Sequence, residues 1–130
     1  MRSFLLILIA ACLLVECKKD TPVAAKYYGR WELRKTFGGF GGGDSTYTPG
    51  NGNIYQFNSS STYKHFREGV VDAQGSFKIT QTRSTEGNNT ESLYFDNDAY
   101  GTPISLADSK LTVGTSVADG ITQEYAKIGN

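Results

Sequence analysis

Apolar and polar residues alternate with a period of two along most of the chain from Tyr27 onward. In the segment GSFKITQTR, residues 75–83, Phe77 and Ile79 share one face, and the polar side chains between them share the other. This period is typical of a half-buried strand, and no helical stripe longer than a turn or two interrupts it. The pattern predicts eight strands, at residues 29–37, 53–57, 62–68, 75–83, 90–96, 104–107, 110–115 and 121–128.

The segments between these strands are short and rich in Asn, Ser, Asp and Gly, the residues that form tight turns. Regular spacing of strands with short connections predicts an antiparallel meander. Eight such strands with one apolar face close best as a barrel, because closure leaves no exposed edge, and a sandwich of two sheets is the structural alternative. The predicted fold class is therefore all-β, an eight-stranded antiparallel up-and-down barrel.

The phase of the alternation assigns one aromatic and aliphatic face to the interior of the barrel. An eight-stranded barrel is either just filled by its side chains or holds one small ligand. The sequence leaves both alternatives open, so these side chains are expected to form either the core or the lining of a cavity. The inward positions are Trp31, Leu33, Tyr55, Phe57, Tyr63, Phe77, Ile79, Leu93, Phe95, Leu111, Val113 and Tyr125.

The opening segment, MRSFLLILIAACLLVECKKD, breaks this pattern with an apolar run over residues 4–15. The run is shorter than the roughly 20 residues that a helix needs to cross a bilayer. It follows Arg2, and a basic start before a short apolar stretch is typical of a secretory signal peptide. We therefore expect the protein to be exported.

Residues Ile9-Ala10-Ala11-Cys12 resemble the lipobox of bacterial lipoproteins, in which a peptidase cuts before a cysteine whose thiol then carries a lipid. We prefer Cys12 as the attachment site, and Cys17, which is followed by the charged residues 18–20, is the alternative. The resemblance implies a membrane anchor of acyl chains such as palmitate and a place in the bacterial cell envelope, at the outer membrane. Residues 1–16 are then signal peptide and lipobox, 17–26 a flexible tether, and 27–130 the barrel domain.

Several segments of that domain resemble the lipocalin-like, calycin-type lipoproteins of Bacteroidetes. They are YYGRWELRKTF near the start, the hairpin YQFNSSSTYK, and the later GSFKI, LTV and EYAKI. The resemblance implies that Trp31 closes one end of the barrel, with Gly29 small so that the chain passes close to the indole ring. It also implies that the loop after the first strand covers the mouth.

Composition narrows the classes of function. The chain has 130 residues and a formal charge of zero, so it has room for one domain and no basic surface for nucleic acid. Neither a cofactor nor a metal site is expected, since the two cysteines lie in the opening segment and the chain has one histidine. We expect a monomer.

Three motifs suggest chemistry, and for each a structural role is preferred. His65 lies on a predicted strand with no nucleophile nearby in the sequence, so it is expected to be structural. The segment FGGFGGGD, residues 37–44, lacks the lysine and helix of a phosphate loop and reads as a mobile lid over residues 38–50. DNDAYG, residues 96–101, only partly matches a calcium loop at Asp96 and Asp98, and residues 44–46 resemble a short O-glycosylation motif.

Together these features predict a lipid-anchored envelope lipoprotein without catalytic activity. Its barrel is expected to bind a small apolar or amphipathic molecule. The alternative is a structural or interaction lipoprotein whose barrel is filled and holds no ligand. A cavity of about 300 Å³ or more inside the barrel favours binding, and a packed interior favours the alternative.

Overall fold

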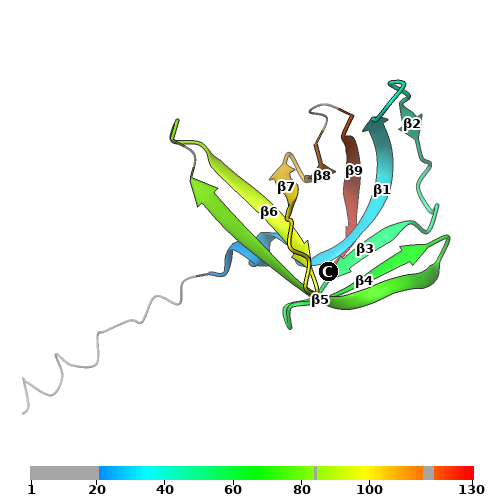
Figure 1. The fold of residues 1–130 in the computed structure, drawn as a ribbon. Helices are drawn as coiled ribbons and strands as arrows, with labels where there is room; N and C mark the ends of the chain where they lie inside the picture. The colour runs from blue at the N-terminus through cyan, green and yellow to red at the C-terminus, as the bar shows by residue number, and fades with distance from the viewer. Residues whose placement is uncertain (1–20, 84, 116–118) are drawn as a thin grey trace, which may run out of the picture.

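The computed structural model describes residues 21–83, 85–115 and 119–130 and is built almost entirely of strands (Figure 1). A 3-10 helix, η2, precedes them at Val23–Tyr27. The strands are β1 (Gly29–Gly38), β2 (Ser45–Thr46), β3 (Ile54–Phe57), β4 (Thr62–Arg67), β5 (Val70–Arg83), β6 (Asn89–Phe95), β7 (Thr102–Ala107), β8 (Lys110–Gly114) and β9 (Ile121–Gly129).

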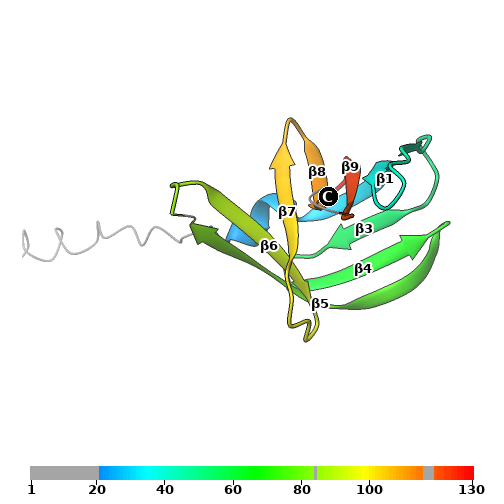
Figure 2. The same cartoon turned by 45° about the horizontal axis from the view of Figure 1, so that its top comes forward.

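The sheet closes on itself because β1 pairs with both β3 and β9. Every other pair joins consecutive strands in antiparallel order, and β2 is a two-residue addition beside the end of β1. The closed ring therefore holds eight strands, which confirms the predicted barrel and rules out the two-sheet sandwich (Figures 1 and 2). Along the closing ladder the register runs from Arg30 opposite Gly129 to Gly38 opposite Ile121.

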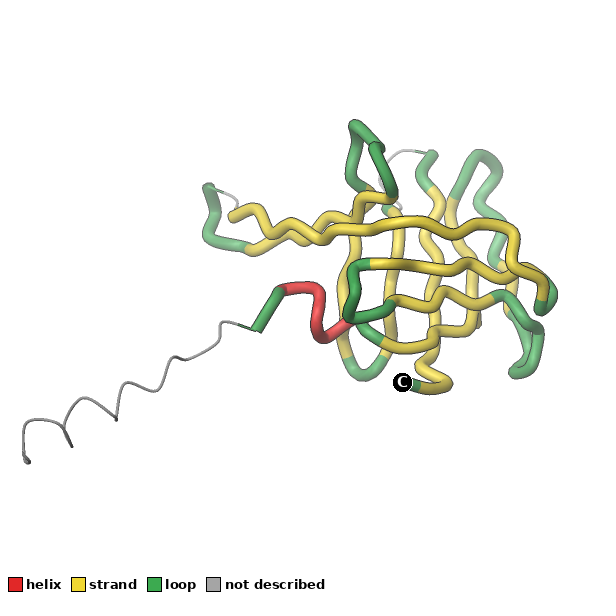
Figure 3. The backbone as a smooth tube through the Cα atoms, turned by 90° about the horizontal axis from the view of Figure 1, so that it is seen from below, coloured by secondary structure: helices red, strands yellow, loops and turns green. Residues whose placement is uncertain are grey.

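In an up-and-down barrel, alternate connections lie at the same end. One end, the mouth, carries the connections that follow β1, β4, β6 and β8. The other end, the floor, carries the turns after β3, β5 and β7, together with η2 and the last residue of the chain. Figure 3 shows the β5–β6 hairpin reaching beyond the other strands, with η2 alongside it.

The side chains inside the ring form one hydrophobic core. All twelve inward positions derived from the sequence belong to it. Nine of them are buried, and Tyr55, Ile79 and Phe95 are partly buried against the rest. Tyr55 and Phe57 stack with ring centroids 5.6 Å apart, and Tyr63 lies 4.3 Å from Phe95. Aromatic rings thus fill most of the interior.

The floor is closed by Trp31 and η2. The indole ring of Trp31 is 1% exposed, and its Nε1 donates a 2.7 Å hydrogen bond to the carbonyl oxygen of Tyr27. Gly29 has a φ of +126°, and a Cβ there would lie 2.6 Å from the carbonyl oxygen of Gly129. The expectation that Gly29 is small to clear the indole ring is therefore wrong, since the backbone of β9 sets the requirement.

Two segments differ most from their predicted boundaries. Val23–Tyr27, most of which was assigned to the tether, is a 3-10 helix, because the buried ring of Tyr27 and the hydrogen bond from Trp31 fix it to the barrel. Strand β5 begins at Val70 rather than at 75. A two-residue turn, Glu68-Gly69, with φ values of 51° and 83°, sends the chain directly into it.

The barrel and its helix lie wholly within residues 21–130, so this segment contains every ladder and core contact described above. The predicted signal peptide, the lipobox, Cys12 and Cys17 lie outside the described residues. Across the described ranges, none of the helices has the length and apolar character that crossing a membrane requires.

Candidate functional site

A hollow of about 280 Å³, here called the mouth hollow, lies where the loops that follow β1 and β4 meet strand β9. It combines an apolar base, made by Leu33 and Tyr125 of the core, with polar side chains around it. Strands β1, β4 and β9 and the loop before β3 each contribute to it. The lining residues are Leu33, Tyr47, Asn53, His65, Arg67, Glu68, Gln123 and Tyr125.

His65 is the most constrained polar group of the mouth hollow. Its Nδ1 lies 2.5 Å from Oδ1 of Asp72, whose Oδ2 lies 3.2 Å from the Arg67 guanidinium. An irregularity in the β4–β5 ladder between His65 and Phe66 allows this pairing of neighbouring strands. The ring of Tyr55 packs 4.4 Å from the imidazole centroid. The side chain of His65 is therefore held on two sides and remains 19% exposed.

Two further hydrogen bonds in the hollow join neutral groups. The Tyr125 hydroxyl donates a 3.1 Å hydrogen bond to Oε1 of Gln123, and Oδ1 of Asn53 accepts one from the Glu68 amide at 3.3 Å. Burial raises the pKa of Tyr125 above its ordinary value, and the neighbouring Tyr55 and Tyr47 raise it further. Tyr125 thus stays a neutral donor at physiological pH.

The loop that forms one wall is fixed by a buried carboxylate. Glu32, on the outer face of β1, accepts hydrogen bonds from the amides of Gly50 at 3.0 Å and Gly52 at 3.2 Å, and its other partner is Arg34 at 2.5 Å. Burial by itself would raise the pKa of Glu32, but these hydrogen bonds and the Arg34 charge lower it overall. Glu32 therefore anchors the segment that brings Asn53 to the hollow.

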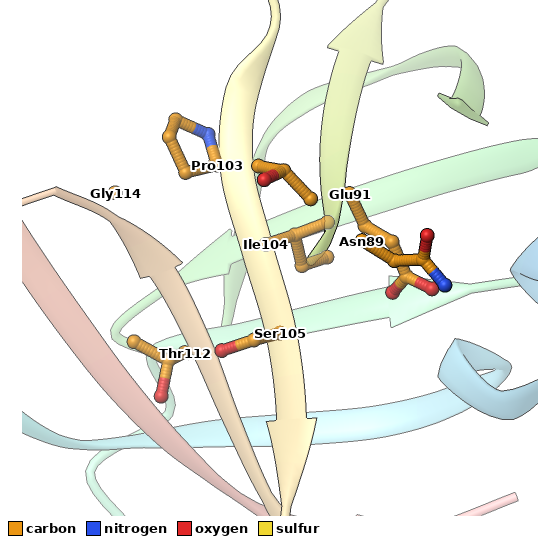
Figure 4. Close-up of a pocket in the computed structure, with 8 residues that line it drawn as sticks. Asn89, Glu91, Pro103, Ile104, Ser105, Thr112 and Gly114 are labelled. Carbon is orange, nitrogen blue, oxygen red and sulfur yellow. The ribbon is translucent and has the colours of Figure 1, made fainter. Parts of the chain in front are cut away.

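A second hollow, of about 190 Å³, lies between β6 and the β7–β8 pair (Figure 4). Here β6 and β7 pair over only three positions, from Glu91 to Leu93. The carboxylate of Glu91 is already bound by Lys26 at 2.8 Å, by the Tyr27 hydroxyl, and by Gln81 at 3.3 Å. Its charge is satisfied within the protein, so we regard this hollow as a structural seam. It is lined by Asn89, Thr90, Glu91, Pro103, Ile104, Ser105, Thr112 and Gly114.

The glycine-rich segment forms the connection between β1 and β2 at the mouth end. Phe40 at its tip is 96% exposed, and a Cβ added at Gly41, Gly42 or Gly43 would meet no other atom. Asp44, at the base of this hairpin, pairs with Lys35 at 2.8 Å. The sequence motif is thus an open hairpin tip beside the mouth hollow.

The turn tested for calcium binding has its first carboxylate engaged. Oδ1 of Asp96 accepts a 2.9 Å hydrogen bond from the Ser76 amide, and Oδ2 accepts one from the Tyr63 hydroxyl at 3.3 Å. Within the described residues, no cluster of three or more His, Cys, Asp or Glu side chains could hold a metal ion. Asp96 fastens the end of β6 to β5.

No protein-family model, curated protein or solved structure matches this chain. The site must therefore be judged on its own geometry. Sequence reasoning named Leu33 and Tyr125 of the mouth hollow as interior residues and singled out His65. It missed Asp72, the partner of His65, although the Glu68-Gly69 turn would have placed it on the facing strand. Tyr47, Asn53 and Glu68 lie in loops, where the strand period does not apply. Arg67 and Gln123 lie on β4 and β9, but they are polar, so an apolar alternation does not find them.

Proposed function

We propose that this protein is a lipid-anchored lipoprotein of the bacterial cell envelope whose barrel binds a small amphipathic molecule at its mouth. The observation that carries the binding proposal is the mouth hollow, where an apolar base meets fixed polar groups. Ligand sites typically combine these two kinds of lining. The anchor part of the proposal is supported by the resemblance of residues 9–12 to a lipobox.

The packing of the core limits where a ligand can lie. Aromatic side chains occupy the interior near the floor, and the mouth hollow lies above Leu33 and Tyr125. Two larger hollows, of about 440 and 480 Å³, lie elsewhere, beside the β3–β4 turn. The 280 Å³ of the mouth hollow lies just below the range of about 300–1,000 Å³ for ligand pockets and equals the volume of about nine water molecules. The proposed ligand is therefore small, with part of its apolar chain against the Tyr rings.

The second candidate is a non-catalytic lipoprotein with a filled barrel that contacts other envelope components. The close packing of the twelve inward side chains favours it. Both candidates are proposed to act as monomers, without catalysis or a cofactor.

Binding can be tested on residues 21–130 with a fluorescent probe that brightens in apolar surroundings. We expect saturable binding that short-chain amphiphiles displace. Gln123→Trp should abolish it by filling the hollow, while the matched variant Thr80→Trp, on an exposed position of β5, should leave it intact. Equal binding by both variants would place the ligand elsewhere, and absence of binding to the unaltered domain would favour the filled-barrel candidate.

The anchor can be tested separately in a bacterial host that processes lipoproteins. Cys12→Ser should release the protein from the membrane fraction and abolish incorporation of labelled palmitate, while Cys17→Ser should retain both. Release by Cys17→Ser alone would show that Cys17 is the attachment site. Absence of label from the unaltered chain and from both single variants would refute lipidation.

A further inference from the structure

The mouth hollow offers chemistry that distinguishes one class of amphiphile from another. We infer that it prefers a head group that is uncharged and donates a hydrogen bond, in the simplest case a primary hydroxyl, over a carboxylate. This inference rests on the proposed function, since it names the ligand class of the same site.

The first step is the protonation pattern of His65. A carboxylate next to one ring nitrogen of a histidine holds the proton on that nitrogen and leaves a lone pair on the other. Asp72 lies 2.5 Å from Nδ1, so Nε2 is the acceptor in the neutral ring. His65 lines the hollow, whereas Asp72, which holds its Nδ1, does not. We therefore assign Nε2 as the nitrogen offered to a ligand. Among the described residues, no protein donor bonds to it.

The second step is the charge around the hollow. Among the residues that line the hollow, Arg67 carries the single fixed positive charge. Its guanidinium already pairs with Asp72 at 3.2 Å. The carboxylate of Glu68 adds a second negative charge without an ion pair in the described part of the chain. Burial raises the pKa of Tyr55 and Tyr125, so their phenols are neutral. An anionic head group would therefore meet no unpaired cation, and it would face the Glu68 carboxylate and a lone pair.

The third step is the fit of a hydroxyl. A hydroxyl group both donates and accepts, so it can donate to Nε2 of His65 and accept from an amide nearby. Asn53 and Gln123 supply such amides, because their carbonyl oxygens are the atoms engaged by Glu68 and Tyr125. Their NH₂ groups remain for the ligand. Leu33 and Tyr125 then lie against the first methylenes of the chain.

The test compares three ligands with the same eight-carbon chain on residues 21–130 at pH 8, namely 1-octanol, its methyl ether and octanoate. The ether is uncharged but has no donor, so it controls for hydrophobicity. We expect octanol to displace the fluorescent probe at a concentration about tenfold or more below that of the ether or of octanoate, the ratio that one lost hydrogen bond produces.

Variants of His65 connect this preference to its nitrogen. His65→Phe should weaken octanol binding about tenfold and leave the ether unchanged, while His65→Gln, which keeps an acceptor, should restore part of the preference. Thermal unfolding of each variant checks that it is folded. If the phenylalanine variant is unfolded, the octanol affinity of the glutamine variant still tests the role of His65. Octanoate binding as tightly as octanol, or octanol binding unaffected by both variants, would overturn the inference while leaving the proposed function standing. Failure of all three ligands and of the probe would overturn both.

Discussion

The hydroxyl of Tyr27 donates a hydrogen bond to the carboxylate of Glu91, which lies 64 residues further along the chain. Tyr27 is fully buried, and the side chain of Glu91 is 9% exposed. This contact joins η2 to the inner face of the β5–β6 hairpin. In this part of the barrel, β6 pairs with β7 at only three positions. The contact therefore fixes the N-terminal segment and the hairpin to each other.

Removing this hydroxyl should destabilise the barrel. Tyr27→Phe leaves the buried carboxylate with one fewer donor, so we expect the free energy of unfolding to fall by about 1–3 kcal/mol. Lys26→Ala, which removes the partly exposed partner of the same carboxylate, should cost less than about 1 kcal/mol. Chemical denaturation of residues 21–130 measures both. A larger loss for the lysine variant would show that the ion pair dominates.

The same carboxylate predicts how stability depends on pH. Burial would raise the pKa of Glu91, but the hydrogen bonds from Lys26 and Tyr27 outweigh it and lower the pKa below that of an unfolded glutamate. Its contribution is complete above the unfolded pKa, about 4.3, and is lost as the pH falls through the lower folded value. Unfolding free energy should decline below about pH 5.

Glu91→Gln should weaken this acid dependence, although it lowers stability at neutral pH. The pKa of Glu32 is lowered in the folded state as well, so part of the decline should persist in the glutamine variant. Denaturation curves at several pH values between 3 and 7 give the two slopes. Identical slopes for the variant and the unaltered protein would remove Glu91 from this account.

Trp31 offers an optical measure of the floor. We expect the folded protein to emit at blue-shifted wavelengths and to resist aqueous quenchers, because the ring is 1% exposed. Trp31→Ala should cost about 3–5 kcal/mol, the range for truncating a buried aromatic side chain. Trp31→Phe should cost less than Trp31→Ala, because it keeps an aromatic ring in the core, although it loses the hydrogen bond to Tyr27. Red-shifted, freely quenched emission would contradict the closed floor.

The glycines of the β1–β2 connection should differ sharply from one another. A Cβ at Gly38 would lie 2.5 Å from the carbonyl oxygen of Gly120, and the φ there is +88°, so Gly38→Ala should cost more than about 1 kcal/mol. Gly43 has open space and an ordinary φ, so Gly43→Ala should change stability by less than about 0.5 kcal/mol. Melting temperatures of the two variants test this. Equal effects would indicate that the β1–β9 closure tolerates strain at Gly38.

Alternation predicted the barrel because inward and outward residues follow the strand period wherever both neighbours in the sheet are regular. Trp31, Leu33 and Tyr125 were placed correctly for this reason. The first half of β5 escaped prediction because Val70 and Val71 are exposed and Asp72 breaks the apolar period. The Glu68-Gly69 turn and the ladder with β4, and not an apolar alternation, make that segment a strand.

The polar part of the site was harder to predict, because it depends on pairings that are distant in the chain or irregular. Asp72 meets His65 at an irregularity of the ladder, where simple alternation fails. Glu32 has the position of an outward, solvated residue, yet the loop that carries Gly50 and Gly52 covers it. Sequence periodicity reports neither a ladder irregularity nor the conformation of a loop.

The helix η2 and the mouth hollow lie at opposite ends of the barrel. A fully extended chain spans at most about 3.5 Å per residue, so a lipid on Cys17 would hold η2 within about 20 Å of the bilayer, and one on Cys12 within about 40 Å. In either case the tether is attached to the closed end of the barrel. Under the proposed anchoring, the binding hollow lies at the end of the barrel remote from the tether, so we expect a bound amphiphile to be exchanged with the surrounding water.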